Sequence, residues 1–288
     1  MSVLESVIEP RQRDIGQFAV ARQLPAGLRR SIGPFVFFDH FGPVALPPGE
    51  GMDVRPHPHI GLATVTYLFE GEIVHRDSLG YVQAITPGAV NWMTAGRGIV
   101  HSERSSEEER AKGPRLHGIQ SWVALPQSAE EARPSFAHHP AASLPEASIG
   151  EARLKLIAGH GFGLRAPVAV LAPTLYADVT LPAGASLAIP PEHRERAVHV
   201  AAGEVLLEGQ SYGPGHMLVL AEGSEARLSS EAGARMLLLG GEPLDGQRHL
   251  FWNFVSSRRE RIEQAKRDWA ECRFPMVPGE HDYIPLPG

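Results

Sequence analysis

Short apolar runs separated by glycine and proline recur along the whole chain, and this rhythm limits the folds it can adopt. The segment GLATVTYLF (residues 61–69) is β-branched and aromatic and alternates as a half-buried strand does. Similar runs resume at ARLKLIAG (residues 152–159) and continue to ARMLLLGG (residues 234–241). The 30 Gly and 25 Pro among 288 residues disfavour long helices. We therefore expect antiparallel strands that close into two barrels or sandwiches.

One segment near the C-terminus has a helical pattern instead. In SSRRERIEQAKRDWAECRF (residues 256–274), apolar residues including Trp269 and Cys272 fall on one helical face. Ser257 and Glu260 have the spacing of a capping box. We expect one amphipathic helix there, with Cys272 buried on its apolar face as an inert thiol.

The charge and the cysteine content exclude several classes of protein. The 27 Lys and Arg residues against 33 Asp and Glu residues give a net charge of −6, which argues against a nucleic-acid-binding protein. A single cysteine rules out an intramolecular disulfide and a thiolate cluster. A bound metal ion would therefore have to be held by imidazole and carboxylate groups.

The sequence also carries no sign of export or of membrane insertion. The first residues, MSVLESVIEPRQRD, lack the apolar core of a signal peptide. No segment approaches the ~20 consecutive apolar residues that a spanning helix needs. With so little cysteine, we expect a cytoplasmic protein that makes no membrane contact, and we expect it to be a monomer.

Two pairs of potential metal ligands stand out. In RPHPHIG, His57 and His59 are two residues apart and would project from the same face of a strand. In GRGIVHSE, His101 and Glu103 have the same spacing. If the two strands are neighbours, the pairs place three imidazoles and one carboxylate together, a set that can hold a metal ion. The alternative is coincidence, because a chain with 14 histidines contains such pairs by chance.

Further polar residues have more than one reading. His75 and Asp77 are again two residues apart, and they could bind a substrate, support the ligands or lie on a solvent-exposed strand. His40 follows Asp39 in FFDHFGP and could lie near the mouth of a barrel.

The glycine framework around the two ligand pairs resembles the two cupin motifs. The first run reads Gly51-x5-His57-x-His59-x4-Thr64-x6-Gly71, and the second reads Gly98-x2-His101. Thr64 stands where many cupins have a ligand glutamate, and Glu103 would replace that carboxylate. With FFDHFGP, RPHPHIGLATVTYLFEGEIVHRDS and NWMTAGRGIVHSE, the chain is similar to the pirin family over nearly its whole length.

This resemblance implies an all-β bicupin, in which two antiparallel β-barrels (double-stranded β-helices) are followed by a C-terminal α-helix. It implies a mononuclear metal site in the N-terminal barrel with His57, His59, His101 and Glu103 as ligands. The expected domains are a metal-binding barrel over residues 1–130, a linker or crossover over residues 131–150, a second barrel over residues 151–245, and the helix and tail over residues 246–288.

In the second barrel the motif glycines persist but the ligands are lost. Gly184-x5-Pro190-x-Glu192 stands in place of the His-x-His motif. Arg196 or Ala197 occupies the glutamate position, and Ala226 replaces the histidine of the second motif. We expect no metal in this barrel.

The metal implied by the resemblance is Fe(II), although the ligand set would also accept Mn, Ni, Co, Cu or Zn. The activity it implies is that of a quercetinase: an Fe(II)-dependent dioxygenase that cleaves a flavonol, a small aromatic polyphenol, with O2 and releases carbon monoxide. Glu103 would be the base that accepts the 3-hydroxyl proton of the flavonol.

The alternative function is a non-catalytic, metal-dependent regulator or redox sensor that acts through a protein partner, as eukaryotic pirins are thought to do. An acidic chain makes direct DNA binding a poor form of that hypothesis. A third reading is a vestigial bicupin with a structural role only, which four intact ligands argue against.

Overall fold

The computed structural model describes residues 2–27 and 29–287. These residues form mainly antiparallel strands, with the two α-helices α1 (Glu107–Lys112) and α2 (Arg259–Ala270), which confirms the predicted all-β fold with a C-terminal helix. Within the same residues, neither helix is long and apolar enough to cross a bilayer.

The chain divides into two compact units whose segments alternate along the sequence. The histidine unit contains the described residues of the ranges 14–19, 41–141 and 244–288, and the companion unit those of the ranges 1–13, 20–40 and 142–243. The domains predicted from the sequence are consecutive ranges of residues instead. They remain a prediction of which segments can fold independently.

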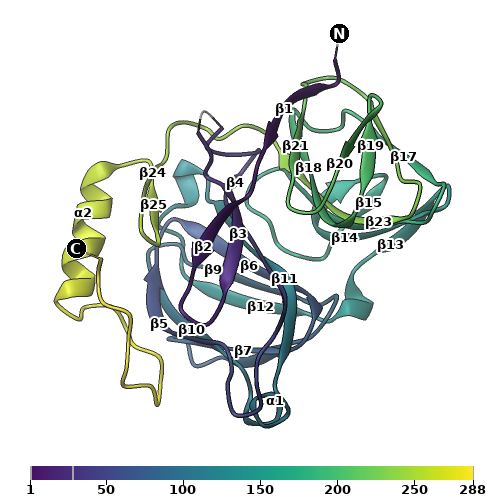
Figure 1. Cartoon of the computed structure of the whole chain (residues 1–288). Coiled ribbons are helices and arrows are strands. Elements are labelled where there is room, and N and C mark those ends of the chain that lie inside the picture. The colour runs from purple at the N-terminus through teal and green to yellow at the C-terminus, as the bar shows by residue number, and fades with distance from the viewer. Residues whose placement is uncertain (1, 28, 288) are drawn as a thin grey trace. The chain divides into compact units, whose positions relative to one another are not determined.

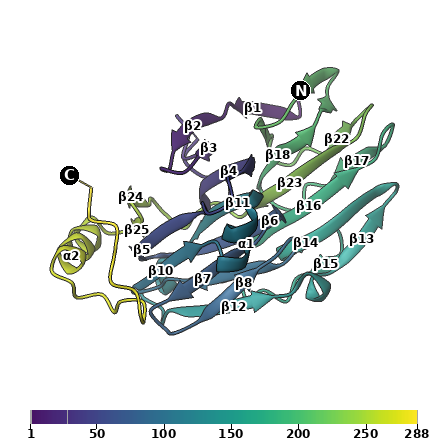
Figure 2. The same ribbon diagram turned by 60° about the horizontal axis from the view of Figure 1, so that its bottom comes forward.

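The histidine unit is built from two antiparallel sheets. Its strands are β4 (Phe35–Ala45), which begins in the companion unit, β5 (Asp53–His59), β6 (Leu62–Glu70), β7 (Ile73–Asp77), β8 (Val82–Ile85), β9 (Val90–Thr94), β10 (Ile99–Arg104), β11 (Arg115–Ala124), β12 (Ser135–His139), β24 (His249–Phe251) and β25 (Phe254–Ser256). The smaller sheet has the order β5-β10-β7-β8, and the larger includes β12-β9-β6-β11-β4. Figure 2 shows β5, β10, β7 and β8 side by side.

The back of the smaller sheet is covered by the C-terminal segment. Ile60 and Val100 pack with Phe254 and with Ile262, Ala265 and Trp269 of α2 in one buried cluster, and Figure 1 shows α2 beside β24 and β25. Gly61 has φ +68°, and a Cβ added there would collide with the carbonyl oxygen of Val255. Glycine therefore permits the close approach of β25 to the end of β5.

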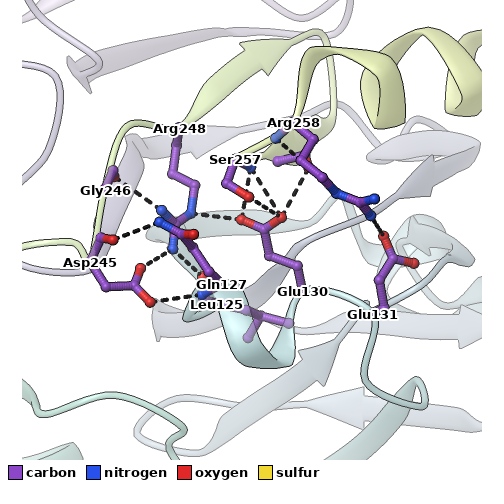
Figure 3. Close-up of polar contacts among 10 residues, drawn as sticks. Leu125, Gln127, Glu130, Glu131, Asp245, Gly246, Arg248, Ser257 and Arg258 are labelled. Atoms are coloured by element: carbon purple, nitrogen blue, oxygen red, sulfur yellow. Dashed lines mark hydrogen bonds and ion pairs between the residues drawn. The ribbon is translucent and has the colours of Figure 1, made fainter.

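The segment that leads into α2 is anchored by a buried ion pair. Figure 3 shows Glu130 between Arg248 on one side and the Ser257 backbone and hydroxyl on the other. Arg248 also donates to the carbonyl of Leu125 over 2.8 Å. These contacts fix β24 and β25 to the loop that follows β11.

The companion unit has the same two-sheet design. Its strands are β1 (Leu4–Ile8), β2 (Arg11–Asp14), β3 (Ala19–Leu24), β13 (Glu146–Ile149), β14 (Ala152–Gly161), β15 (Leu164–Arg165), β16 (Thr174–Leu181), β17 (Ser186–Ile189), β18 (Glu195–Gly203), β19 (Val205–Leu207), β20 (Gln210–Tyr212), β21 (Met217–Leu220), β22 (Ala226–Ser229) and β23 (Ala234–Gly241). The sheets β1-β21-β18-β23-β16-β14-β13 and β17-β22-β19-β20 share one apolar core, which includes Leu154, Leu187, Val198 and Leu228.

Two local predictions for the C-terminal helix are wrong. The helix ends at Ala270, so Cys272 lies beyond it with φ 55° and is exposed rather than buried. The N-cap is Arg258, without a side-chain cap, because the Ser257 hydroxyl bonds Glu130 instead of forming a capping box with Glu260. The Ser257 hydroxyl, which the local sequence pattern predicts as a helix cap, thus bonds a residue that is distant in the sequence.

The segment 131–150, expected to be a linker or crossover, contains regular structure. It includes β12, which pairs with β9, and β13, which pairs with β14. Both strands lie at the ends of their sheets, where short and polar strands need only one partner.

Candidate metal centre

The register of three adjacent strands brings together the side chains singled out in the sequence. β10 lies between β5 and β7, and His101 is the Cα partner of His57 on one side and of Asp77 on the other. The pairing with β5 is interrupted by a register shift between His101 and Glu103. The two predicted ligand pairs therefore lie on neighbouring strands.

His57, His59 and His101 form a compact buried cluster. One nitrogen from each ring lies within 4.8 Å of the other two, and this is the only such group of three or more His, Cys, Asp or Glu side chains in residues 2–27 and 29–287. The Nε2 atoms of His59 and His101 are 3.1 Å apart. The exposed fractions of His57, His59 and His101 are 7%, 1% and 0%, so solvent has almost no access to the three side chains.

Burial keeps these imidazoles neutral. Desolvation lowers the pKa of His57 to about 4. Desolvation and the neighbouring imidazoles lower the pKa values of His59 and His101 well below the usual histidine value. Neutral imidazole is the form that binds a metal ion, so the cluster needs no deprotonation at neutral pH.

Backbone carbonyls orient two of the rings. His57 Nδ1 lies 2.9 Å from the carbonyl oxygen of Arg55, and His59 Nδ1 lies 3.2 Å from that of Asn253. A carbonyl oxygen only accepts, so each Nδ1 must carry the proton and each Nε2 keeps its lone pair. Nitrogen donors arranged in this way fit a divalent transition metal, as in other histidine sites.

Glu103 lies on the same strand as His101 and is 6% exposed. Its Oε1 atom accepts from Gln120 Nε2 over 3.1 Å and lies 3.2 Å from the Thr66 hydroxyl. Burial raises the pKa of this carboxyl group, while its interaction with His75 and the hydrogen bonds from Thr66 and Gln120 lower it. Glu103 does not belong to the group of three histidines, and Oε2 is the oxygen that these contacts leave for a metal ion.

His75 and Asp77, which had several readings in the sequence, adjoin the cluster. They are 4% and 0% exposed, so the solvent-exposed reading is wrong. His75 Nε2 lies 3.0 Å from Asp77 Oδ2, and His75 Nδ1 lies 3.4 Å from His101 Nδ1. His40 belongs to the companion unit, where its Nδ1 lies 3.1 Å from His199 Nε2.

Several contributors were not identified from the sequence. Gln120 lies beside Ser121 between the apolar residues Ile119 and Trp122 of β11, and its polar side chain was a usable signal. Phe136, which stacks on His75 with ring centroids 4.3 Å apart, lies in the segment expected to be a linker. Asn253 contributes a backbone carbonyl 194 residues away from His59, and no sequence pattern marks such a group.

In the companion unit, Arg196, one of the two residues predicted at the glutamate position of the first motif, is 1% exposed. Its guanidinium group donates to the carbonyls of Pro190, Ala221 and Ser224 over 2.8–3.1 Å. A buried cationic side chain therefore links the loops around Pro190, Ala221 and Ser224.

Comparisons with known proteins agree with this arrangement. Residues 17–123 match the family described as "Pirin", and residues 176–275 match the "Pirin C-terminal cupin domain". A "Pirin-like protein" of Caulobacter vibrioides is 47% identical over 289 residues, which cover 99% of this chain and 100% of that protein. A Pseudomonas aeruginosa protein named "Putative quercetin 2,3-dioxygenase" is 39% identical over 258 residues, 89% of this chain and 80% of that one.

Among solved structures, the crystal structure of a quercetin 2,3-dioxygenase from Acinetobacter baumannii is similar over nearly the whole chain. It has a TM-score of 0.91 and 34% sequence identity, and the match covers 98% of this chain and 95% of that chain. Both barrels are therefore shared with that structure, which confirms the predicted bicupin fold.

Proposed function

The chain belongs to the pirin family, and we propose that it is a metal-dependent dioxygenase of the quercetinase type. The observation that carries the proposal is the cluster of three buried, neutral histidines with a buried glutamate on the same strand as one of them. The names of the Pseudomonas and Acinetobacter relatives support the same chemistry.

We propose that His57, His59, His101 and Glu103 hold one metal ion, with Fe(II) as the native metal. When bound, the ion supplies Lewis acidity and a redox centre at which a flavonol and O2 meet. Mn, Ni, Co, Cu and Zn are also compatible with nitrogen and carboxylate ligands, so the assay must compare them.

The protein's own groups prepare the substrate. Glu103 accepts the proton of the flavonol 3-hydroxyl group, because burial raises the proton affinity of its carboxylate. Gln120 and Thr66 hold Oε1 in place, so Oε2 would be the atom available to the ion and the substrate. The resulting flavonolate is electron-rich, and it consumes one O2, loses carbon monoxide and opens its ring.

The decisive experiment reconstitutes the apoprotein with Fe(II), Mn, Ni, Co, Cu or Zn and follows quercetin absorbance, oxygen uptake and carbon monoxide together. We expect turnover with at least Fe(II), with one O2 consumed per flavonol. Stoichiometric metal binding without turnover for any of these metals would reject the dioxygenase.

One surface feature favours a second function, that of a metal-dependent regulator that binds a protein partner. Leu79 and Tyr81, in the turn that follows Asp77, and Val82, the first residue of β8, are 43%, 48% and 65% exposed. Exposed apolar side chains that cluster in this way are typical of interaction sites. If the assay shows binding without turnover, this turn is the surface to test for a partner.

A further inference from the structure

One ligand of the cluster differs from the other two in its Nδ1 partner. His57 and His59 face backbone carbonyls, which only accept hydrogen bonds, whereas His101 faces the Nδ1 atom of another histidine, His75, over 3.4 Å. An imidazole nitrogen either donates or accepts, depending on the tautomer. The state of His101 therefore depends on what fixes the proton of His75.

Two tautomers of His101 have opposite consequences for a metal ion. If His101 Nδ1 carries the proton, its Nε2 lone pair is free. If Nε2 carries the proton, it donates to His59 Nε2, 3.1 Å away, and both ligand atoms are consumed by that hydrogen bond. The first arrangement leaves the site open to a cation, and the second closes it.

Asp77 selects between these arrangements. Its Oδ2 atom lies 3.0 Å from His75 Nε2, and its Oδ1 atom accepts from the backbone N–H groups of Leu79 and Tyr81 over 2.9 and 3.1 Å. The side chain is 0% exposed. A carboxylate only accepts, so His75 donates from Nε2, and the neutral form of its ring then offers the Nδ1 lone pair to His101.

The ring of His75 is also held in orientation. The ring stacks on Phe136 with an interplanar angle of 12°. In the pairing of β7 with β10, His75 is the Cα partner of Glu103. The three groups Asp77, His75 and His101 thus form a chain of hydrogen bonds that starts at the β7–β8 turn and ends at the cluster.

We propose that His75 and Asp77 are positioning residues that hold His101 in the Nδ1–H tautomer and strengthen its Nε2 atom as a metal donor. The inference rests on the metal site of the proposed function, but the tautomer itself belongs to the apoprotein. The His59 and His101 lone pairs then face each other over 3.1 Å, a repulsive contact that a bound cation relieves. The hydrogen bonds to a carboxylate move electron density towards the ion, as carboxylate–histidine–metal triads do.

Asp77→Asn gives the sharpest test because it reverses the donors and acceptors in the hydrogen bonds from Asp77 through His75 to His101. The two backbone N–H donors keep the amide oxygen at the Oδ1 position, so the amide NH2 group faces His75 Nε2. His75 then carries its proton on Nδ1 and donates to His101 Nδ1, and His101 is left with Nε2–H. The control is Asp39→Asn, also a buried carboxylate, paired with Arg22 in the companion unit.

Two measurements are needed. Long-range 1H–15N spectra of histidine-labelled apoprotein report the tautomers, and competition titration with Co(II) reports the affinity. We expect His101 as Nδ1–H in the wild type and Nε2–H in Asp77→Asn, with Co(II) affinity lower by about 10–100-fold. The Asp39→Asn control keeps the wild-type values, and the iron-loaded Asp77→Asn protein has a higher reduction potential.

Wild-type apoprotein with His101 as Nε2–H would overturn the proposal even if no variant folds. An unchanged tautomer and Co(II) affinity in Asp77→Asn overturns it too. If the wild type binds no metal at all, the proposed function fails, whereas the apoprotein spectra still decide whether Asp77 sets the tautomer.

Discussion

Glu130 Oε1 lies 2.9 Å from Arg248 Nε, and both side chains are only 3% exposed. Glu130 also accepts hydrogen bonds from the Ser257 hydroxyl and backbone (Figure 3). It accepts a further one from the Ser256 hydroxyl. The pair thereby holds the segment that contains Asn253, whose carbonyl accepts from His59 Nδ1. We therefore expect loss of this ion pair to weaken both the C-terminal segment and the orientation of the His59 ring.

Glu130→Gln is expected to lower the free energy of unfolding by about 3 kcal/mol, because the buried Arg248 loses one of its two carboxylate partners and keeps only Asp245. Denaturant unfolding measures the effect, and Glu130→Gln combined with Arg248→Met should recover part of the loss. The control is Glu108→Gln in the exposed Glu108–Lys112 pair, for which no measurable change is expected. Equal changes in the free energy of unfolding for Glu130→Gln and Glu108→Gln would show that burial of the Glu130–Arg248 pair adds nothing to stability.

The apoprotein is expected to lose stability as the pH falls from about 6.5 to about 4. The pKa of His57 is about 4 in the folded protein, against about 6.5 in an unfolded chain. In this window the unfolded state binds more protons than the folded state. The free energy of unfolding therefore decreases as the pH is lowered, by roughly 1.4 kcal/mol per pH unit for each such histidine. Glu103, whose pKa burial raises, acts in the opposite direction.

Unfolding of the apoprotein at a series of pH values checks this dependence. His57→Phe, which cannot titrate, should reduce the slope between the two pKa values. A slope that is the same in wild type and variant would mean that His57 is already protonated in the folded apoprotein.

His101→Ala should abolish stoichiometric metal binding, with an affinity loss of at least about 100-fold, since changes to outer partners alone cost 10–100-fold. His138→Ala is the control, because His138 bonds Asn91 on β9 and is not one of the three clustered histidines. Metal content of the purified proteins measures both. Full occupancy in His101→Ala would remove His101 from the ligand set.

Glu103→Gln is expected to lower kcat by about 100-fold or more while metal affinity changes less, because the amide keeps an oxygen ligand but cannot accept the substrate proton. Single-turnover kinetics with quercetin separate the two effects. Glu70→Gln, at the partly exposed end of β6, is the matched control. Unchanged turnover in Glu103→Gln would exclude Glu103 as the base.

Arg196→Leu should destabilise the protein by about 3 kcal/mol, because the carbonyls of Pro190, Ala221 and Ser224 lose their donors in a buried place. Arg196→Lys should retain part of the stability, since an ammonium group reaches fewer of the three oxygens. Metal content should not change, because the histidine cluster belongs to the other unit. Thermal unfolding together with metal analysis checks both statements.

The strand periodicity was enough to find the centre of the site. His57 with His59, and His101 with Glu103, each show the two-residue spacing of one strand face, and no distant contact was needed to see them. The pairing of the two strands followed from the motif resemblance. The apolar stripe of α2 was visible for the same reason, since Ile262, Ala265 and Trp269 are buried as their spacing predicts.

Features set by distant partners could not be found in this way. The capping box failed because Glu130, far away in the chain, takes the Ser257 hydroxyl. The predicted burial of Cys272 was wrong because the helix ends two residues earlier, at Ala270, and Cys272 itself has a positive φ. The Asn253 carbonyl is invisible in any side-chain pattern, since every residue has one.

The alternation of the two units along the chain has a consequence for biosynthesis. Residues 142–243 of the companion unit are translated before the segment that supplies Asn253. The ribosome therefore makes residues 142–243, which complete the companion barrel and contribute none of the three clustered histidines, before the carbonyl partner of His59 exists. Metal capture should follow translation of that barrel, and a nascent chain stalled before residue 244 should emerge with an incompletely ordered site.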